Sequence, residues 1–236
     1  RYYAIDNAFA EFQLAKRKVA KVSVPVMRRL PVYHHFLTGL AEKGIDRVSS
    51  TTVARQFGYD PIKVRKDLAL TGAVGRPRIG FVTRELLAHI EAFLGWSQTQ
   101  EAVLVGCGAL GSALLGYEGF SQCGWEILVA FDKDPDRAGT RIQGKPVMPL
   151  ERLSEVCRQM NVKVGIITTP AKSAQKIADM MVDAGLRGIW NFAPTSVQVP
   201  EGVILQQENL LASLTILGLK LKIMKSERKP GLLIDE

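Results

Sequence analysis

The chain has 236 residues, of which 47% are hydrophobic and 23% are charged, and it carries a net charge of +8. This ordinary globular composition excludes disordered and fibrous classes, and no apolar run is long enough to cross a bilayer or resembles a signal peptide. All of the net charge lies in residues 1–95, with 16 Lys and Arg against 8 Asp and Glu, which favours a polyanionic partner.

The basic part of the chain opens with a segment that we assign to an extension. Residues 1–22 lie outside the predicted folded core, and residues 23–95 form a first domain. Apolar residues at helical spacing predict an amphipathic helix over residues 26–41.

A helix-turn-helix is predicted next. The Ser-Ser-Thr-Thr run at 49–52 is N-cap chemistry for a short helix, and Gly58 and Tyr59 form the turn that follows it. Asp60 and Pro61 suit the N-cap and the first residue of a second helix. Helix, short turn and helix is the spacing of a helix-turn-helix unit.

A small β-hairpin, or wing, is predicted over residues 72–81, where three glycines, a proline and two arginines precede an apolar pair. Residues 83–95 follow as a connecting helix. A domain boundary is expected near residues 96–101.

Basic residues gather on the second helix of this unit and on the wing. Those on the helix cover more than one face, so some of them must contact phosphates. A wing arginine would meet a phosphate or enter the minor groove. Each charge alone could be ordinary surface charge, but the helix-turn-helix context favours DNA. The residues assigned to double-stranded DNA are Ser50, Lys63, Arg65, Lys66, Arg76 and Arg78.

From residue 102 onward, short apolar strands alternate with helices. Strands are predicted at 102–105, 126–132, 164–168 and 188–192, and helices at 110–117, 150–160 and 171–184. This alternation predicts an α/β domain over residues 96–205, with a parallel sheet covered by helices on both faces.

The last predicted helix runs from residue 207 to about residue 225 and is apolar on too many sides for one sheet to cover. We therefore assign residues 206–236 to a dimerisation helix and tail, and expect a partner subunit to cover the helix.

A Gly-x-Gly-x-x-Gly pattern joins the first predicted strand to the helix after it. Gly106 allows the tight turn, Gly108 lets the backbone approach a pyrophosphate, and Gly111 lets the helix and strand pack closely. Asp132 ends the next strand and suits the ribose hydroxyls of NAD, while its charge would repel the 2′-phosphate of NADP. The alternative is a tight strand–helix turn that binds no ligand.

Two more strands end at the same predicted sheet edge, at residues 168–170 and 191–194, where they could contact nicotinamide or ribose. Cys107 lies within the glycine loop, either as a redox-sensitive thiol or as a small residue tolerated between glycines. The three cysteines show no CxxC spacing and lie near no histidine, which argues against a zinc site or disulfides and favours the cytoplasm.

Residues 96–236, which carry no net charge, offer no pair of residues suited to catalysis. His34, His35 and His89 all lie in the first 95 residues, and too little chain follows the predicted sheet to form a substrate domain. Dinucleotide binding without chemistry is the simpler hypothesis. The alternatives are a small NAD-dependent oxidoreductase with a DNA- or protein-binding appendage, and a regulator that senses a nucleotide or CoA.

The order of these motifs resembles the Rex family of redox-sensing transcriptional repressors, over about residues 24–224. The resemblance is carried by the runs PVMRRLPVY, RVSSTTVARQFGYDPIKVRKDL, GCGALGSALLGYEGF, VAFDKDPDRAG, AGLRGIWNFAP and VPEGVIL. It implies a winged helix, a Rossmann-like domain and a domain-swapped terminal helix. It further implies a homodimer that binds an inverted-repeat operator and is released by NADH, with NAD⁺ favouring the DNA-bound form.

The resemblance also implies site residues. Tyr117 matches a tyrosine that reports the nicotinamide state. The full set assigned to NADH and NAD⁺ is Gly106, Cys107, Gly108, Ala109, Leu110, Gly111, Tyr117, Asp132, Thr169, Pro170, Asn191, Phe192 and Ala193. The wing departs from the family pattern, because Arg76, Pro77 and Arg78 stand where the family has a basic residue, an arginine and a glycine.

Overall fold

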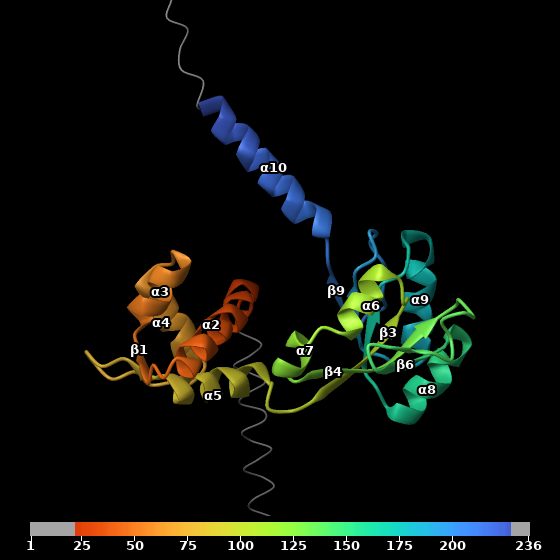
Figure 1. The fold of residues 1–236 in the computed structure, drawn as a ribbon, viewed down its shortest axis with the longest axis horizontal. Coiled ribbons are helices and arrows are strands. Elements are labelled where there is room, and N and C mark those ends of the chain that lie inside the picture. Colours follow the sequence, from red (N-terminus) through yellow and green to blue (C-terminus); the bar gives the residue numbers. More distant parts are fainter. Residues whose placement is uncertain (1–21, 228–236) are drawn as a thin grey trace, which may run out of the picture. The chain divides into compact units, whose positions relative to one another are not determined.

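The computed structural model describes residues 22–227 and divides the chain into two units, one ending at Gln98 and the other beginning at Thr99 (Figure 1). Most of the predicted extension and the end of the predicted tail, residues 228–236, lie outside the described residues.

The described part of the first unit is mainly helical. Its helices are α2 (Val24–Glu42), α3 (Ser50–Phe57), α4 (Pro61–Leu70) and α5 (Thr83–Leu94). Their apolar faces meet in one core, where Leu30, Val53, Leu68 and Ile90 are fully buried. Burial of one such side chain contributes roughly 1.5–3 kcal/mol, so packing rather than helix propensity holds the unit together.

The predicted caps of α3 and α4 are confirmed. The Ser49 hydroxyl accepts a hydrogen bond from the Thr52 N–H at 3.0 Å. The Asp60 carboxylate accepts from the N–H groups of Ile62 and Lys63 at 2.8 and 3.0 Å. Both caps satisfy N–H groups that a helix start leaves unpaired. The helix-turn-helix therefore forms where the sequence predicts it.

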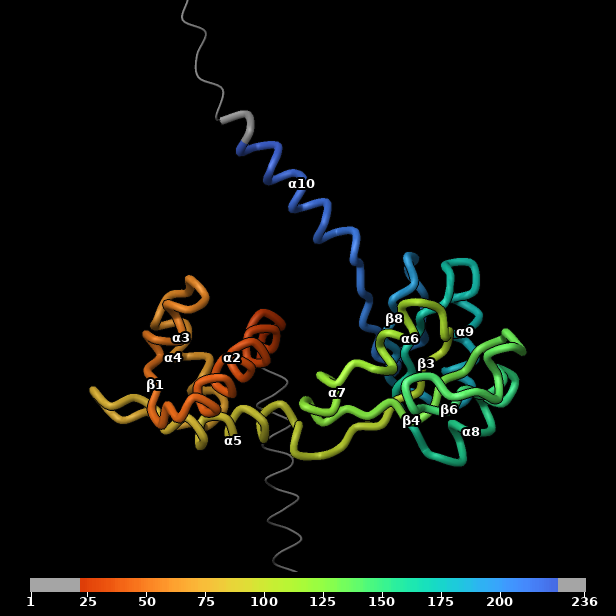
Figure 2. The backbone as a smooth tube through the Cα atoms, viewed as in Figure 1, coloured from red at the N-terminus to blue at the C-terminus, as the bar shows by residue number. Residues whose placement is uncertain are grey.

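The wing is less regular than the predicted hairpin. Strand β1 (Arg47–Val48) pairs antiparallel with β2 (Phe81–Val82), and beyond this ladder the wing closes only at the bridge between Arg76 and Gly80. Pro77 has no N–H to donate, so a ladder cannot continue into the tip. The result is a loop, between α4 and α5 in the chain, that projects outward near β1 (Figure 2).

The second unit is built on a seven-stranded sheet with the order β5-β6-β4-β3-β7-β8-β9. Its strands are β3 (Gln100–Val105), β4 (Trp125–Asp132), β5 (Arg141–Ile142), β6 (Lys145–Pro149), β7 (Val164–Ile167), β8 (Gly188–Asn191) and β9 (Ile204–Gln207). Only the pairing of β5 with β6 is antiparallel. The predicted parallel sheet is confirmed, with β5, β6 and β9 as additions that the sequence did not indicate.

Helices cover both faces of this sheet, as the strand β3 makes clear. Val103 and Val105 point into one apolar cluster, with residues of α8 (Leu153–Met160) and α9 (Ala171–Asp183). Ala102 and Leu104 point into a second cluster on the other face, with residues of α6 (Ala109–Leu115). Two short helices, α7 (Gly119–Gln122) and the 3₁₀ turn η1 (Leu150–Arg152), complete the connections. The α/β class and the Rossmann-like arrangement are confirmed.

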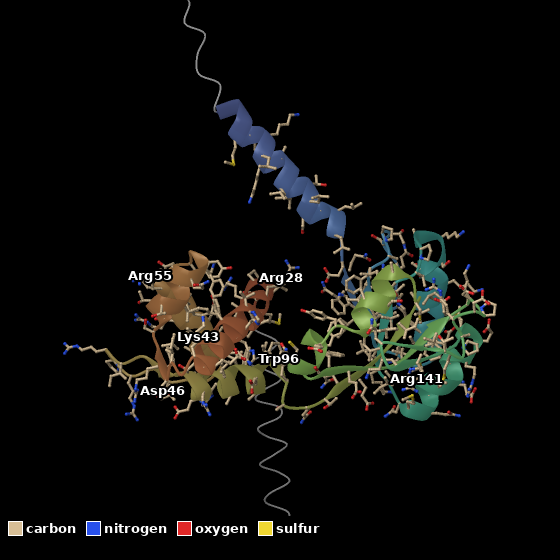
Figure 3. All side chains as sticks on the ribbon, in the orientation of Figure 1. Arg28, Lys43, Asp46, Arg55, Trp96 and Arg141 are labelled. Carbon is tan, nitrogen blue, oxygen red and sulfur yellow. The ribbon has the colours of Figure 1, made fainter. Side chains whose placement is uncertain are left out.

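The last helix, α10 (Leu210–Glu227), begins three residues later than predicted, because Gln207 belongs to β9 and pairs with Asn191 of β8. Its apolar side chains are exposed: Leu210, Leu211, Leu214 and Leu217 each keep 54–66% of their surface. Side chains stand out from the helix in several directions (Figure 3). Within the described residues, no helix has the length and apolar character needed to cross a membrane.

Candidate cofactor site and nucleic-acid surface

Two of the three loop glycines are required by the protein's own packing. The loop joins β3 to α6, and Gly106 turns the chain with φ +103°, a conformation that other residues rarely adopt. A methyl group on Gly111 would lie 2.0 Å from the Gly106 carbonyl oxygen. Gly111 therefore lets α6 start directly against the strand, as predicted.

Gly108 differs from its two neighbours. Its φ is −67°, and a methyl group placed on it would meet no atom within 4 Å. No side chain caps α6 at this position, so no N-cap side chain satisfies the first N–H groups of the helix. No contact within the unit requires glycine at position 108. A phosphate group that approaches the backbone closely would require it. The residues present therefore fit a dinucleotide pyrophosphate.

Asp132 lies beside this loop at the end of β4. One carboxylate oxygen accepts the Cys107 N–H at 2.6 Å, and the other accepts the Asp134 N–H at 3.0 Å. Arg137 donates to the Cys107 carbonyl and forms an ion pair with Asp134. The carboxylate is thus fixed where an acid would meet the adenosine ribose of a bound dinucleotide.

Strands β7 and β8 end at the same edge, because both are parallel to β3. The Thr168 hydroxyl donates to the Gly106 carbonyl at 2.6 Å and so holds the glycine loop. Thr169, next in the chain, has a buried hydroxyl oxygen with no hydrogen-bond partner among the described residues. A buried hydroxyl without a partner costs about 1–3 kcal/mol, which a bound ligand could relieve.

Asn191 organises the neighbouring loop. It is fully buried, donates to the Thr195 carbonyl at 2.9 Å and to the Gln207 side chain at 2.8 Å, and accepts the Ala193 N–H at 3.0 Å. The side chain is fully engaged within the protein, so it shapes the Phe192–Ala193 backbone. Contact of this loop with the cofactor stays a prediction.

Tyr117 lies away from the glycine loop, beyond the far end of α6. It lines a cavity of about 540 Å³ with residues at the amino ends of β3, β4 and β6. A row of rings leads from it back to β8: Tyr117 to Phe120 at 5.1 Å, Phe120 to Trp190 at 5.8 Å, and Trp190 to Phe192 at 4.6 Å. Tyr117 and Phe192 are therefore connected by packed aromatic groups rather than by direct contact.

The cysteines are poorly suited to redox sensing. Cys107 is fully buried, and burial together with the nearby Asp132 raises the pKa of its thiol to about 11. Burial also raises the pKa of Cys157 to about 11. The thiolate is the reactive form, so both thiols are unreactive at neutral pH. The interpretation of Cys107 as a small tolerated residue is favoured.

Alkylation offers a direct check. Iodoacetamide at pH 7.5 should modify Cys123, which is only partly buried, before Cys107 and Cys157. Modification of Cys107 should accelerate only as the pH approaches about 11, because only then does the thiolate form. Peptide mass spectrometry after timed quenching measures each rate. Fast modification of Cys107 at neutral pH would restore the redox-sensor hypothesis.

The predicted DNA contacts occupy two exposed sites in the first unit. Lys63, Arg65 and Lys66 are exposed on α4, and Lys63 lies 6.0 Å from the centre of the Tyr59 ring. Arg76 and Arg78 are exposed in the wing. Ser50 differs, since it begins α3 and keeps only 8% of its surface exposed. Little of the Ser50 side chain is available to a partner.

The inward face of α4 is held by an ion pair that was not predicted from the sequence. Arg29 of α2 donates to both oxygens of Asp67, at 2.7 and 2.9 Å, and the Tyr33 hydroxyl donates to Asp67 at 3.0 Å. The hydrogen bond to Asp67 raises the pKa of Arg29, and burial, followed by the bond to Asp67, raises the pKa of Tyr33. Asp67 is 3% exposed, so the network fixes one face of α4 while the basic face stays free.

Comparisons with known proteins cover most of the chain. Two family models match, "CoA binding domain" over residues 97–195 and "Putative DNA-binding protein N-terminus" over residues 21–69. The redox-sensing transcriptional repressor Rex of Treponema denticola is 38% identical over 90% of this chain and 100% of its own length. The Rex of Carboxydothermus hydrogenoformans is 41% identical over 86% of this chain and 97% of its own length. This chain belongs to the Rex family.

Solved Rex-family structures agree with this assignment. The repressor RSP in complex with β-NAD⁺ and operator DNA matches with a TM-score of 0.81 and 32% identity, over 88% of this chain and 96% of RSP. RSP in complex with β-NADH matches with a TM-score of 0.79 and 32% identity, over 89% and 98%. These full-length Rex relatives are regulators rather than enzymes, which favours a regulator over the oxidoreductase alternative.

The sequence analysis did not single out Gln207 or Asp67, each of which acts through a contact with a segment distant in the chain. Thr168 was placed at the predicted sheet edge within residues 168–170, but its hydrogen bond to the glycine loop was not predicted.

Proposed function

We propose that this chain is a transcriptional repressor that binds operator DNA when NADH is low and leaves it when NADH is bound. The observation that carries the proposal is the close match, over almost the whole chain, to one repressor solved with NAD⁺ and operator DNA and also with NADH. The open space at Gly108 and the exposed basic face of α4 are the two features that such a cycle needs.

The second unit would hold the dinucleotide along one edge of its sheet. Backbone N–H groups of residues 106–111 would bind the pyrophosphate, and Asp132 would accept hydrogen bonds from the adenosine ribose. The 168–170 and 191–194 segments would lie near the nicotinamide. The nicotinamide is the part that differs between NADH and NAD⁺. The proposed response requires only that the two forms of the dinucleotide differ in their affinity for the DNA-bound and DNA-free conformations of this chain.

The apolar surface of α10 supports a homodimer. One sheet covers one side of a helix, whereas α10 exposes leucines on several sides. A second copy, with α10 exchanged between subunits, would bury them. A two-fold dimer presents two copies of α4 and therefore fits an inverted-repeat operator in the cytoplasm.

The decisive experiment uses a duplex that the full chain selects from a pool of random sequences. Binding of the labelled duplex is followed by fluorescence anisotropy with NADH, NAD⁺ or coenzyme A present. Release by NADH but not by NAD⁺ is expected. Release by coenzyme A alone would instead support the CoA-sensing alternative that the matching family model raises. Release by none of the three would contradict the proposal.

An Arg65→Ala variant should lose operator affinity by about tenfold or more and keep its affinity for NADH. Arg65 is exposed on α4, away from the face that packs on the core. Anisotropy with the selected duplex and a fluorescence titration with NADH measure the two affinities. Arg158→Ala, an exposed arginine of the second unit, is the matched control. Equal duplex affinity for Arg65→Ala and the parent would remove α4 from the DNA interface.

A further inference from the structure

The tip of the wing is a fixed three-residue loop. The Arg76 carbonyl accepts hydrogen bonds from the N–H groups of Ile79 and Gly80, at 3.2 and 2.9 Å, and the Arg76 N–H donates to the Gly80 carbonyl at 2.8 Å. Gly80 is held against the body of the unit, because a methyl group on it would lie 2.4 Å from the Val48 carbonyl oxygen. Pro77, Arg78 and Ile79 therefore form an apex on a rigid base.

Arg78, in the middle of this apex, has a left-handed backbone with φ +62°. An L-residue with a long side chain adopts this conformation at a cost that glycine avoids. The side chain of Arg78 is exposed, and the described residues provide its guanidinium with no hydrogen bond or ion pair. The loop's backbone hydrogen bonds hold the turn, but no hydrogen bond or ion pair of the Arg78 side chain within the described residues offsets the cost of placing an arginine there.

The two other non-glycine residues with positive φ have reasons within the protein. Asn161 caps the end of α8, and asparagine tolerates the left-handed region. Gln143 turns the β5–β6 pair, and its side chain packs so closely that a methyl group on Gly116 would lie 2.8 Å from it. Arg78 also lies in a turn, between Arg76 and Gly80, but it is neither an asparagine nor a side chain packed within the unit. Strain kept at an exposed residue without an internal partner points to a contact outside the molecule.

We propose that Arg78 enters the minor groove of the operator and that the strained apex is kept because it projects this side chain. The inference rests on the proposed operator binding of the first unit. With α4 in the major groove, the wing reaches the adjoining minor groove, where the potential is most negative over A·T-rich sequence. A guanidinium is the group best suited to that groove. Ile79, next to Arg78 in the chain, is 48% exposed and could contact the wall of the groove. Arg76, at the base of the loop, remains for a phosphate.

The test compares Arg78→Gly with Arg78→Ala in the full chain. Both remove the guanidinium, so both should bind the selected duplex about tenfold or more weakly. The slope of the logarithm of duplex affinity against the logarithm of salt concentration should also fall in magnitude by about 1. The melting temperature of Arg78→Gly should be higher than that of Arg78→Ala, because only glycine relieves the strained φ. At an unstrained position the alanine variant would be the more stable of the two. Gln143→Gly is the control for replacing a left-handed residue, and it should leave duplex affinity unchanged.

The groove is identified by chemical change in the DNA. Substituting 2,6-diaminopurine for adenine at the outer edges of the repeat adds an amino group to the minor groove alone. This substitution should weaken binding of the parent and leave Arg78→Gly unaffected. Equal losses for both would place Arg78 outside the minor groove.

Two further outcomes separate this inference from the proposed function. If the parent binds the duplex, is released by NADH, and is matched in affinity by Arg78→Gly, the inference fails and the function stands. If the parent itself shows no release by NADH, the function fails first. A higher melting temperature for Arg78→Ala than for Arg78→Gly would overturn the argument from strain.

Discussion

A Gly108→Val variant should fold, bind the selected duplex like the parent, and no longer respond to NADH. Valine meets no protein atom near its Cβ, so the unit has room for it. The added methyl groups would occupy the space assigned to the pyrophosphate. Loss of two charge-assisted backbone contacts, each about 1.5–3 kcal/mol, would lower NADH affinity by about two orders of magnitude or more.

Gly111→Val provides the contrast, because there a side chain collides with the Gly106 carbonyl and should destabilise the second unit itself. Circular dichroism and thermal unfolding separate the two variants, and anisotropy with and without NADH gives the functional result. Asp132→Ala should also lose the NADH response while DNA binding survives. If Gly108→Val kept the parental NADH affinity, the dinucleotide would have to bind elsewhere.

An Asp67→Ala variant should destabilise the first unit by about 3–5 kcal/mol, the usual cost of leaving one partner of a buried ion pair uncompensated. The Arg29 side chain is only 12% exposed and would lose both of its hydrogen bonds. Operator binding should fall with the loss of folded α4. NADH binding should persist, because the loop of residues 106–111 belongs to the other unit.

Urea unfolding followed by far-UV circular dichroism measures this loss. Glu155→Ala is the matched control, since it breaks the exposed pair between Arg152 and Glu155 and should leave stability unchanged. A double variant in which Arg29 and Asp67 both become apolar should recover part of the stability. An Asp67→Ala variant as stable as Glu155→Ala would show that the ion pair contributes little.

Local chemistry allowed much of the fold to be predicted. The caps at Ser49 and Asp60 involve residues two or three positions apart, and the glycine pattern from Gly106 to Gly111 spans one turn. Such signals are readable because the atoms that interact are close in the sequence. The alternation of strands and helices likewise fixed the parallel sheet.

The parts of the fold and of the site that were not predicted depend on contacts between segments distant in the sequence. The bond between Arg29 and Asp67 spans 38 residues, and that between Thr168 and Gly106 spans 62. Neither residue pair carries a local pattern that distinguishes it from surface charge or a strand end. Ser50 shows that burial is equally hard to read from local sequence, because packing leaves this residue of a helix start only 8% exposed, and its contact with DNA stays a prediction.

The exposed leucines of α10 bear on how the protein matures. In the proposed homodimer α10 buries its apolar surface against a second copy, so the last step of folding would be bimolecular, with a rate that rises with the square of chain concentration. Stability then also depends on concentration, and dilution should lower the melting temperature. A cell that makes few copies of this regulator would therefore hold a larger share of it unassembled and open to proteolysis.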